Sequence, residues 1–214
     1  MKAQLTTSSR SYRGLSQEAR RADRRARLVA AAIAVYGERG YHQATVKAVC
    51  DAAGLTERYF YESFANSEAL LIDSFDAVVH SVLGQITRAA QDAGRGRITR
   101  SRAMLHAYFE SLQNEPQSAR VFLVEIRGVS RAVDQAFDGA LRAIGREVAR
   151  IVAPPGVPEN ALLQAGVVGG VIHIALRWIE DGYRPGIDTV VDSALRLGTV
   201  LASASRRRTT PAPR

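Results

Sequence analysis

Cysteine is almost absent from this sequence. One residue among 214, Cys50, is a cysteine, so no disulfide can form within a chain and no oxidising compartment is implied. Cys50 lies among apolar residues, where a free cysteine behaves as a small buried hydrophobe. Histidine is scarce as well, and the four histidines show no spacing typical of metal ligands. We therefore expect neither a disulfide scaffold nor a metal site.

Long uninterrupted hydrophobic runs are also missing. The stretch 161–179 approaches the length of a membrane span, but Gln164, His173 and Arg177 interrupt it. An arginine-rich segment followed by apolar residues 28–36 resembles a signal peptide, yet it starts too far into the chain and keeps helical spacing. The sequence predicts buried helices in both places, no membrane partner and a cytoplasmic location.

Enzyme motifs are missing too. The sequence contains no glycine-rich phosphate loop, no Gly-x-Ser-x-Gly elbow and no paired histidine or cysteine ligands. We therefore expect no catalytic residue and no cofactor.

Positive charge is unevenly distributed along the chain, whose formal net charge is +8. Residues 1–64 hold 11 Lys or Arg against 6 Asp or Glu, and the last nine residues add four arginines. The part between them, 65–205, holds 14 positive and 15 negative groups. A basic N-terminal third beside a near-neutral body is typical of a separate nucleic-acid-binding module. A solvated arginine-rich surface would give the same balance, so the assignment needs a motif.

The spacing of apolar residues predicts an all-α fold without strands. Glycine and proline mark the breaks, most clearly at Gly40, Gly54, 92–97 and 153–158. The expected helices are 17–39, 45–53, 56–64, 66–91, 99–115, 118–127, 131–152, 159–181 and 188–203.

Two short helices meet at a glycine turn within residues 45–70. Thr45 stands where it caps the first helix, Gly54 ends that helix, and Thr56 caps the second. Helices joined by a turn of three or four residues containing glycine form a helix-turn-helix. The window therefore predicts this motif, and the alternative is a generic helical hairpin with an apolar core.

The second helix of this pair buries little surface, yet its first turn is polar. Glu57, Arg58 and Tyr59 are presented there, while Phe60 and Phe64 fall on the face that packs underneath. Such a helix is suited to enter the major groove. Arginine can pair with guanine O6 and N7, at roughly 1–3 kcal/mol of discrimination. The carboxylate of Glu57 either accepts from cytosine N4 or interacts favourably with the helix N-terminus.

The same window resembles the TetR family of transcriptional regulators. The matching residues are Thr45-Val46, Ala53-Gly54, Thr56, Tyr61, Phe64 and Glu68-Ala69-Leu70, preceded by Tyr36-Gly37 and Gly40-Tyr41. The resemblance covers residues 24–75 in detail; beyond them only length and helix count agree. It implies a homodimer with an N-terminal helix-turn-helix head and a C-terminal helical domain that binds a small molecule.

The resemblance also implies which residues contact DNA. Thr45, Thr56 and Tyr61 would contact phosphates, and Arg58 and Tyr59 would meet base edges. Hydroxyl groups and helix N-termini can donate to phosphate oxygens in this way.

Three features near this surface depart from or add to the family pattern. Members commonly have lysine where this chain has Ser67, so one phosphate contact is expected to be lost or weakened. Arg58 and Tyr59 replace smaller residues, so the recognition surface is bulkier than usual. Lys47 can reach a phosphate or a base edge from the preceding helix.

The C-terminal half predicts a dimer interface. Helix 159–181 contains Gly166, Gly169 and Gly170, each costing about 1 kcal/mol of helix propensity relative to alanine, and close helix packing would explain that cost. The resemblance implies that helices 159–181 and 188–203 form a four-helix interface in a homodimer; packing within one chain is the alternative. A two-fold dimer places two recognition helices on half-sites roughly 34–36 Å apart.

Aromatic residues and histidines lie on the helices that would surround a ligand. They are His106, Tyr108, Phe109, Phe122, His173 and Trp178. A largely apolar pocket with a few polar groups suits a lipophilic or aromatic inducer. Packing in the core is the alternative for each residue.

These patterns together divide the chain into four parts. They are a flexible basic arm (1–18), a helix-turn-helix DNA-binding domain (19–65), a helical ligand-binding and dimerisation domain (66–205) and a disordered basic tail (206–214). The arm and tail either add DNA contacts or are merely solvated.

The predicted function is a ligand-responsive transcriptional regulator, a repressor released from a palindromic operator by a small-molecule inducer. By linkage, the inducer weakens DNA binding only as much as DNA weakens inducer binding. The alternatives are an architectural DNA-binding protein without a ligand and, less favoured by the motifs, an enzyme.

Overall fold

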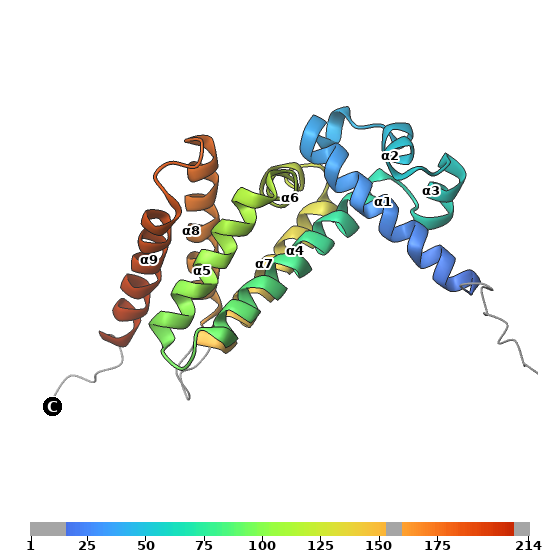
Figure 1. The fold of residues 1–214 in the computed structure, drawn as a ribbon. Coiled ribbons are helices and arrows are strands. Elements are labelled where there is room, and N and C mark those ends of the chain that lie inside the picture. The colour runs from blue at the N-terminus through green and yellow to red at the C-terminus, as the bar shows by residue number, and fades with distance from the viewer. Residues whose placement is uncertain (1–15, 153–159, 208–214) are drawn as a thin grey trace, which may run out of the picture.

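The structure, a computed structural model, describes residues 16–152 and 160–207 (Figure 1). This described part is helical and contains no strand, which confirms the predicted all-α fold class. Its elements are α1 (Gln17–Arg39), the 3-10 turn η1 (Tyr41–Gln43), α2 (Val46–Ala53), α3 (Glu57–Ser63), α4 (Ser67–Asp92), α5 (Arg97–Asn114), α6 (Pro116–Arg120), the π-helical turn η2 (Val121–Glu125), α7 (Arg131–Val152), α8 (Ala161–Glu180) and α9 (Ile187–Arg207).

Helices α1, α2 and α3 form a head at one end of the molecule (Figure 1). The hydroxyl of Ser16 accepts a hydrogen bond from the amide of Ala19 at 3.1 Å and so caps α1. Gly40 ends α1 at φ 86°, a conformation that glycine adopts without strain. The apolar faces of the three helices share one core, which includes Leu28, Ala32, Val35, Val49, Phe60 and Phe64.

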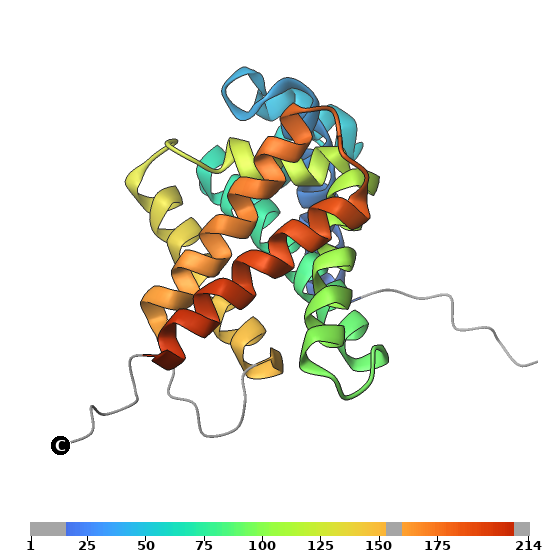
Figure 2. The same ribbon diagram turned by 90° about the vertical axis from the view of Figure 1, so that its left-hand side faces the viewer.

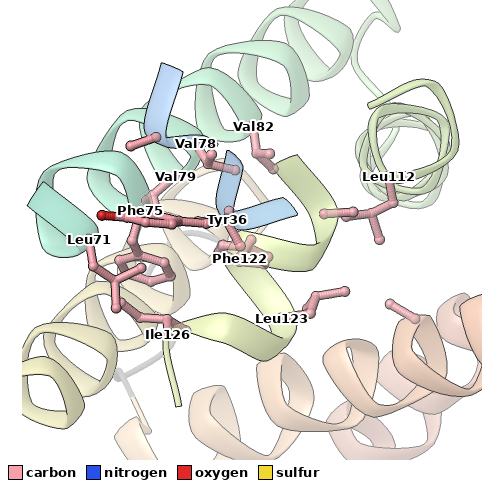
Figure 3. Close-up of a cluster of buried hydrophobic side chains, with 14 of the residues drawn as sticks. Tyr36, Leu71, Phe75, Val78, Val79, Val82, Leu112, Phe122, Leu123 and Ile126 are labelled. Carbon is pink, nitrogen blue, oxygen red and sulfur yellow. The ribbon is translucent and has the colours of Figure 1, made fainter. Parts of the chain in front are cut away.

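Helix α4 connects the head to the body. It begins at the cap Asn66, whose side chain accepts from the amide of Ala69 at 2.8 Å. Figure 3 shows its buried face meeting side chains of α1, α5 and the α6–η2 segment. At the centre, the rings of Phe75 and Phe122 stack with centroids 5.6 Å apart. The head and the body therefore share a continuous hydrophobic core.

The segment after α5 differs from its prediction. The sequence predicts a helix over 118–127 behind a break at Pro116, whereas α6 starts at Pro116 itself and continues as the π-helical turn η2. Proline suits the first helical position, because its missing N–H would have no partner there. Three consecutive residues of η2 are buried: Val121, Phe122 and Leu123. The wider turn therefore places three successive side chains in the core.

Helices α8 and α9 form the outer face of the body, away from the head (Figures 1 and 2). They contact each other at Gly170, where a Cβ atom would lie 2.5 Å from Cδ2 of Leu197. At Gly166 and Gly169, no atom of the described residues lies within 4 Å of such a Cβ atom. Packing within one chain therefore accounts for one of the three glycines and leaves two on an uncovered face.

Two helices, α4 and α8, are long and apolar enough to cross a membrane by length and composition alone. One face of α4 is buried in the core, as expected for a core helix of a soluble protein. Fewer residues of α8 are buried, namely Ile172, Ala175 and Trp178. The apolar helix α8 is therefore largely left uncovered by the described part of its own chain.

Three predicted irregular segments fall largely or wholly outside the described residues. They are the arm (1–18), the proline-rich break (153–158) and the tail (206–214).

Candidate DNA-binding surface and ligand domain

The turn between α2 and α3 has the geometry of a helix-turn-helix. The hydroxyl of Thr45 accepts from the amide of Ala48 at 3.1 Å and caps α2. Gly54 ends α2 in the left-handed conformation at φ 63°, and the amide of Leu55 then donates to the carbonyl of Cys50 at 2.9 Å. These bonds close the turn and fix the direction in which α3 leaves it.

The short helix α3 is held from below and exposed above. Phe60 and Phe64 are buried in the head core, with rings 6.0 Å apart. On the opposite face, Arg58 has a side chain that is 84% exposed and Tyr61 is 62% exposed. Of the predicted first turn, Glu57 and Arg58 are therefore exposed, whereas Tyr59 is half-buried.

The two threonines differ in how their hydroxyl groups are used. The hydroxyl of Thr45 accepts the hydrogen bond that caps α2, although the residue remains exposed. Thr56 occupies the N-cap position of α3, but its side chain makes no capping hydrogen bond within the described chain. The Thr56 hydroxyl and the free amides of the first turn of α3 can therefore donate to a phosphate.

Each of the two candidate cations on this surface forms an ion pair with a carboxylate on its own helix. Nε of Arg58 donates to Oε1 of Glu62 at 2.9 Å, and Nζ of Lys47 donates to Oδ2 of Asp51 at 2.7 Å. The hydrogen bond to Asp51, with the carboxylate charge, raises the pKa of Lys47 above its usual value. Lys47 therefore stays charged at neutral pH. Both pairs are exposed, so exchanging the carboxylate for a phosphate requires little desolvation.

Tyr59 is less free than its neighbours. The residue is half-buried, and the guanidinium of Arg24 in α1 lies 4.6 Å from the centroid of its ring. This cation–π contact orients the ring and leaves part of it accessible. The six predicted DNA-contact residues lie on α2, α3 or at their N-cap positions, and all are exposed or half-buried: Thr45, Lys47, Thr56, Arg58, Tyr59 and Tyr61.

Arginines of α1 hold α2 and α3 in place, a role that the sequence did not reveal. Arg27 Nη2 donates to the carbonyl of Ala53, the last residue of α2, at 2.7 Å. Arg25 Nη1 donates to the carbonyl of Ser63, the last residue of α3, at 2.6 Å. Arg25 also pairs with Asp73 of α4. Cations at helix C-termini are stabilising, so part of the positive charge of this third of the chain is structural.

Charged groups also join the head to the body. The side chain of Glu125 in η2, 9% exposed, accepts from Nε of Arg120 at 2.8 Å and from the amide of Tyr41 at 2.7 Å. Arg120 in turn donates to the carbonyls of Gly37 and Glu38 at 3.4 and 3.3 Å. We call this set the junction.

Five of the six residues predicted to surround a ligand fall in different environments. Phe109 and Trp178 are buried against each other, with ring centroids 5.5 Å apart, and Phe122 is buried against Phe75. His106 is only half-buried, with Nδ1 3.8 Å from a carboxylate oxygen of Glu110, and His173 is exposed on α8.

These positions do not test contact with a ligand, so the ligand-binding role of the six residues stays a prediction. The two histidines lie outside the core, because helical periodicity alone does not say which face of a helix its own chain covers.

Three buried side-chain polar atoms of the described residues have no hydrogen-bond partner, namely Nε of Arg24, Nε of Arg100 and the hydroxyl of Tyr108, and only Tyr108 belongs to the hydrophobic core. The hydroxyl of Tyr108 in α5 is buried and has no hydrogen-bond partner among the described residues. Burial raises the pKa of this phenol above its usual value, so it stays neutral and keeps a proton to donate. An unpaired buried hydroxyl costs free energy unless water or a ligand accepts from it.

No group of three or more potential metal ligands occurs among the described residues.

Comparison with known proteins identifies the head. Residues 28–73 match the family model described as bacterial regulatory proteins, tetR family. These residues run from α1 into α4 and contain the whole helix-turn-helix. The DNA-binding head of this chain belongs to the TetR family. Regulators of this family bind DNA and small-molecule ligands and act as dimers, and this TetR-family chain is a DNA-binding transcriptional regulator with a helical C-terminal domain.

The similarity extends beyond the head. This TetR-family regulator is 22% identical over 188 residues to FasR, an HTH-type transcriptional activator of Mycolicibacterium smegmatis, covering 82% of this chain and 81% of FasR. Its fold is similar to that of the transcriptional regulator FadR from Bacillus subtilis in complex with stearoyl-CoA. That likeness has a TM-score of 0.69 at 19% identity and covers 80% of this chain and 96% of FadR.

A second structure gives the same result. The fatty acid degradation regulator FadR from Bacillus halodurans matches with a TM-score of 0.70 at 17% identity, over 86% of this chain and 96% of that one. At these identities the likeness concerns the fold. Family and fold together point to a regulator and not to an enzyme.

Proposed function

We propose that this TetR-family protein is a repressor that leaves a palindromic operator when a long-chain acyl-CoA binds its body. The observation that carries the DNA-binding part is the first turn of α3, where Arg58 is exposed and the Thr56 hydroxyl is unused among the described residues. The domain division at residue 65 and a cytoplasmic location belong to the same proposal.

At the operator, each exposed residue has a role that suits its chemistry. Thr45, Thr56 and Tyr61 position the head on phosphates, because hydroxyl groups contact the backbone without reading sequence. Arg58 leaves Glu62 and pairs with a guanine, while the accessible edge of Tyr59 contacts a neighbouring base. Lys47 exchanges Asp51 for a phosphate.

A second copy of the chain covers α8 and α9 in this proposal. Leu162 on α8 is 87% exposed, and the uncovered Gly166 and Gly169 lie one and two turns further along the same helix. Small residues let a partner helix approach closely, and a two-fold axis at this face would place the two heads on equivalent half-sites. The exposed apolar surface of α8 is then an interface and not a membrane span.

An acyl chain suits the interior of the body. Its core contains the apolar rings of Phe109, Phe122 and Trp178, and the unpaired hydroxyl of Tyr108 offers a donor for a carbonyl oxygen. The helix α7 has a largely apolar face whose residues are mostly only half-buried, among them Phe137, Leu141, Ile144 and Val148. The stearoyl-CoA named for the B. subtilis regulator makes this ligand class the first to test.

The junction supplies the connection between ligand and DNA. Glu125 and Arg120 belong to the segment that also buries Phe122, so repacking around a ligand would act on the carbonyls of Gly37 and Glu38 at the end of α1. The head would then adopt a different orientation, and the spacing of the two heads would change. The coupling is reciprocal, so operator DNA lowers the affinity for the acyl-CoA by the same factor.

The proposal is tested by titrating labelled DNA from upstream of the protein's own reading frame at several salt concentrations. We expect tight, salt-sensitive binding that Arg58→Ala weakens with altered sequence preference, whereas Arg142→Ala, an exposed arginine of α7, binds like the wild type. Stearoyl-CoA should release the wild type. An unchanged Arg58→Ala titration on selected genomic fragments would overturn the assignment of α3.

The printed name of FasR makes activation the alternative to repression. In-vitro transcription from the bound promoter separates the two, because a repressor lowers transcript yield until the acyl-CoA is added. DNA binding that no acyl-CoA affects would instead favour the architectural role.

A further inference from the structure

A charged groove lies between the C-terminal halves of α4 and α7, away from the head. Its volume is about 520 Å³ and it is open to solvent. The lining residues are Leu83, Gly84, Thr87, Arg88, Ala143, Arg146, Glu147 and Arg150. The groove is separate from the aromatic core residues considered above as ligand contacts, none of which lines it.

Positive charge prevails in this groove. Its one lining carboxylate, Glu147, lies 2.6 Å from Nη1 of Arg150, and the two side chains neutralise each other. Arg88 and Arg146 form no ion pair within the described part of the chain. Two unpaired guanidinium groups thus face one small groove, although the charge of the whole body is near neutral. Like charges placed together in this way repel each other unless an anion lies between them.

The position of Arg88 is set by Gly84. A Cβ atom at Gly84 would lie 3.6 and 3.9 Å from the two terminal nitrogens of Arg88. The guanidinium therefore folds back by one turn of α4 and lies over the glycine, inside the groove. The half-buried Thr87 adds a hydroxyl beside it. A planar guanidinium fork and a hydroxyl are groups that bind phosphate oxygens.

The remaining wall of the groove is apolar and leads inward. Leu83 and Ala143 line it, and Leu83 also packs against the hydrophobic core of the body. A ligand that combines a phosphate-bearing head with a hydrocarbon chain matches this change from charge to apolar surface.

We infer that this groove binds the phosphate-bearing head group of the CoA thioester, with Arg88, Arg146 and Thr87 on its phosphates and the acyl chain entering between α4 and α7. The inference rests on the proposed function and specifies where the ligand is held. It predicts that the nucleotide part contributes affinity through charge, so ligand affinity falls as salt rises.

The test is isothermal titration of the full-length protein with stearoyl-CoA, free CoA, ATP and stearate. We compare the wild type with the double variant Arg88→Gln/Arg146→Gln, with Thr87→Val, and with the control Arg142→Gln one turn from Arg146 on α7. Loss of a charge-assisted bond costs roughly tenfold in affinity or more, so the double variant should bind stearoyl-CoA at least about 100-fold more weakly. Thr87→Val should show a smaller loss, and Arg142→Gln should match the wild type.

Stearate and ATP distinguish the two halves of the ligand. Stearate should bind the wild type weakly and to the same extent in all variants, because it lacks phosphates. ATP should bind more weakly than stearoyl-CoA and lose affinity in the double variant, because it offers phosphates without the chain. Equal stearoyl-CoA affinities for the wild type and the double variant, with unchanged thermal unfolding, would overturn the assignment of the groove as the phosphate-binding site. Stearate binding as tightly as stearoyl-CoA would overturn it as well.

Failure of the proposed function gives a different result. If stearoyl-CoA binds through Arg88 and Arg146 but leaves the operator complex intact, the groove assignment stands and the repressor mechanism is wrong. If stearoyl-CoA releases the operator equally well from the wild type and the double variant, the repressor mechanism stands and the groove assignment is wrong.

Discussion

The head and the outer face of the body differ in how far the chain covers their apolar residues. In the head, Phe60 and Phe64 are buried by the same chain, and arginines of α1 bind the carbonyls at the ends of α2 and α3. On the outer face, Leu162 is almost fully exposed, and Gly166 faces no described atom. The apolar residues of the head are covered within one chain, whereas the residues of the outer face are apolar like a protein interior and yet exposed. The core of the head is thus closed by its own chain, whereas the uncovered face of α8 is the basis for the proposal that a second copy of the chain packs there.

Removing the ring of Phe60 tests whether the head is complete. Phe60→Ala should lower the free energy of unfolding by about 3–5 kcal/mol, because the emptied site is enclosed by a rigid core. Urea unfolding followed by circular dichroism measures the change. The neighbouring Tyr61→Ala, at an exposed position, should stay within about 0.5 kcal/mol of the wild type. Equal effects of the two variants would mean that the head core is not closed.

A charge on α8 tests the outer face. Leu162→Glu should leave the fold intact but weaken dimerisation by roughly tenfold or more, because a carboxylate would be buried against the partner helix. Analytical ultracentrifugation measures the monomer–dimer equilibrium. Ile98→Glu, at an exposed position of α5, is the matched control and should dimerise normally. An unchanged dimer in Leu162→Glu would place the interface elsewhere.

The junction lies between these two regions. Glu125→Gln removes the charge of the carboxylate that accepts hydrogen bonds from Arg120 and from the amide of Tyr41. It should destabilise the protein by about 1.5–3 kcal/mol. It should also reduce the response of operator binding to acyl-CoA, measured as the ratio of DNA affinities with and without ligand. A ratio equal to that of the wild type would show that the coupling bypasses the junction.

Charge on the DNA-facing surface should affect binding with little effect on folding. Lys47→Ala should leave the unfolding midpoint unchanged and reduce the slope of log affinity against log salt by about 1, since one phosphate contact is lost. The pKa of Lys47 is raised by Asp51, so the amine is protonated below that pKa and loses its charge only as the pH rises through it. Binding through Lys47 should therefore be constant from pH 6 to about pH 9. A slope unchanged by Lys47→Ala would remove this residue from the interface.

The smallest effect concerns the thiol of Cys50. Burial, assisted by the charge of Glu57, raises the pKa of this thiol, so little thiolate is present at neutral pH. Ellman's reagent should react slowly with the native protein and rapidly after unfolding in urea. Since the sequence contains no other cysteine, the signal is unambiguous. Fast reaction in the native state would show that the head opens.

Local signals made the head predictable. The cap at Thr45 and the glycine at 54 act over three or four residues, and the structure reproduces the helices that they delimit, although Thr56 makes no capping hydrogen bond at the start of α3. The arginine contacts were not predictable in the same way. Arg25 and Arg27 bind carbonyls that are 38 and 26 residues away, and a basic run in a sequence gives no sign of such partners.

The body was less predictable, because its site depends on helix orientation. Helix positions agree with the sequence to within a few residues, but His173 faces outward and Pro116 opens a helix. The groove with Arg88 and Arg146 joins helices whose residues are about 60 positions apart, and neither helix alone shows a cluster. Periodicity identifies helices and their apolar faces, whereas the pairing of faces depends on tertiary packing.

The length of α4 gives the molecule a mechanical property. Its 26 residues extend from beside the head to beyond the groove, which corresponds to a rod about 39 Å long. A rod of this length that tilts by about 5° about one end moves its other end by roughly 3 Å. Two heads whose α4 helices tilt in opposite directions would separate by about twice that distance, a sizeable part of one DNA groove. A small rearrangement around Arg88 can therefore be amplified geometrically, and the stiffness of α4 is as important for release as the affinity of any single contact.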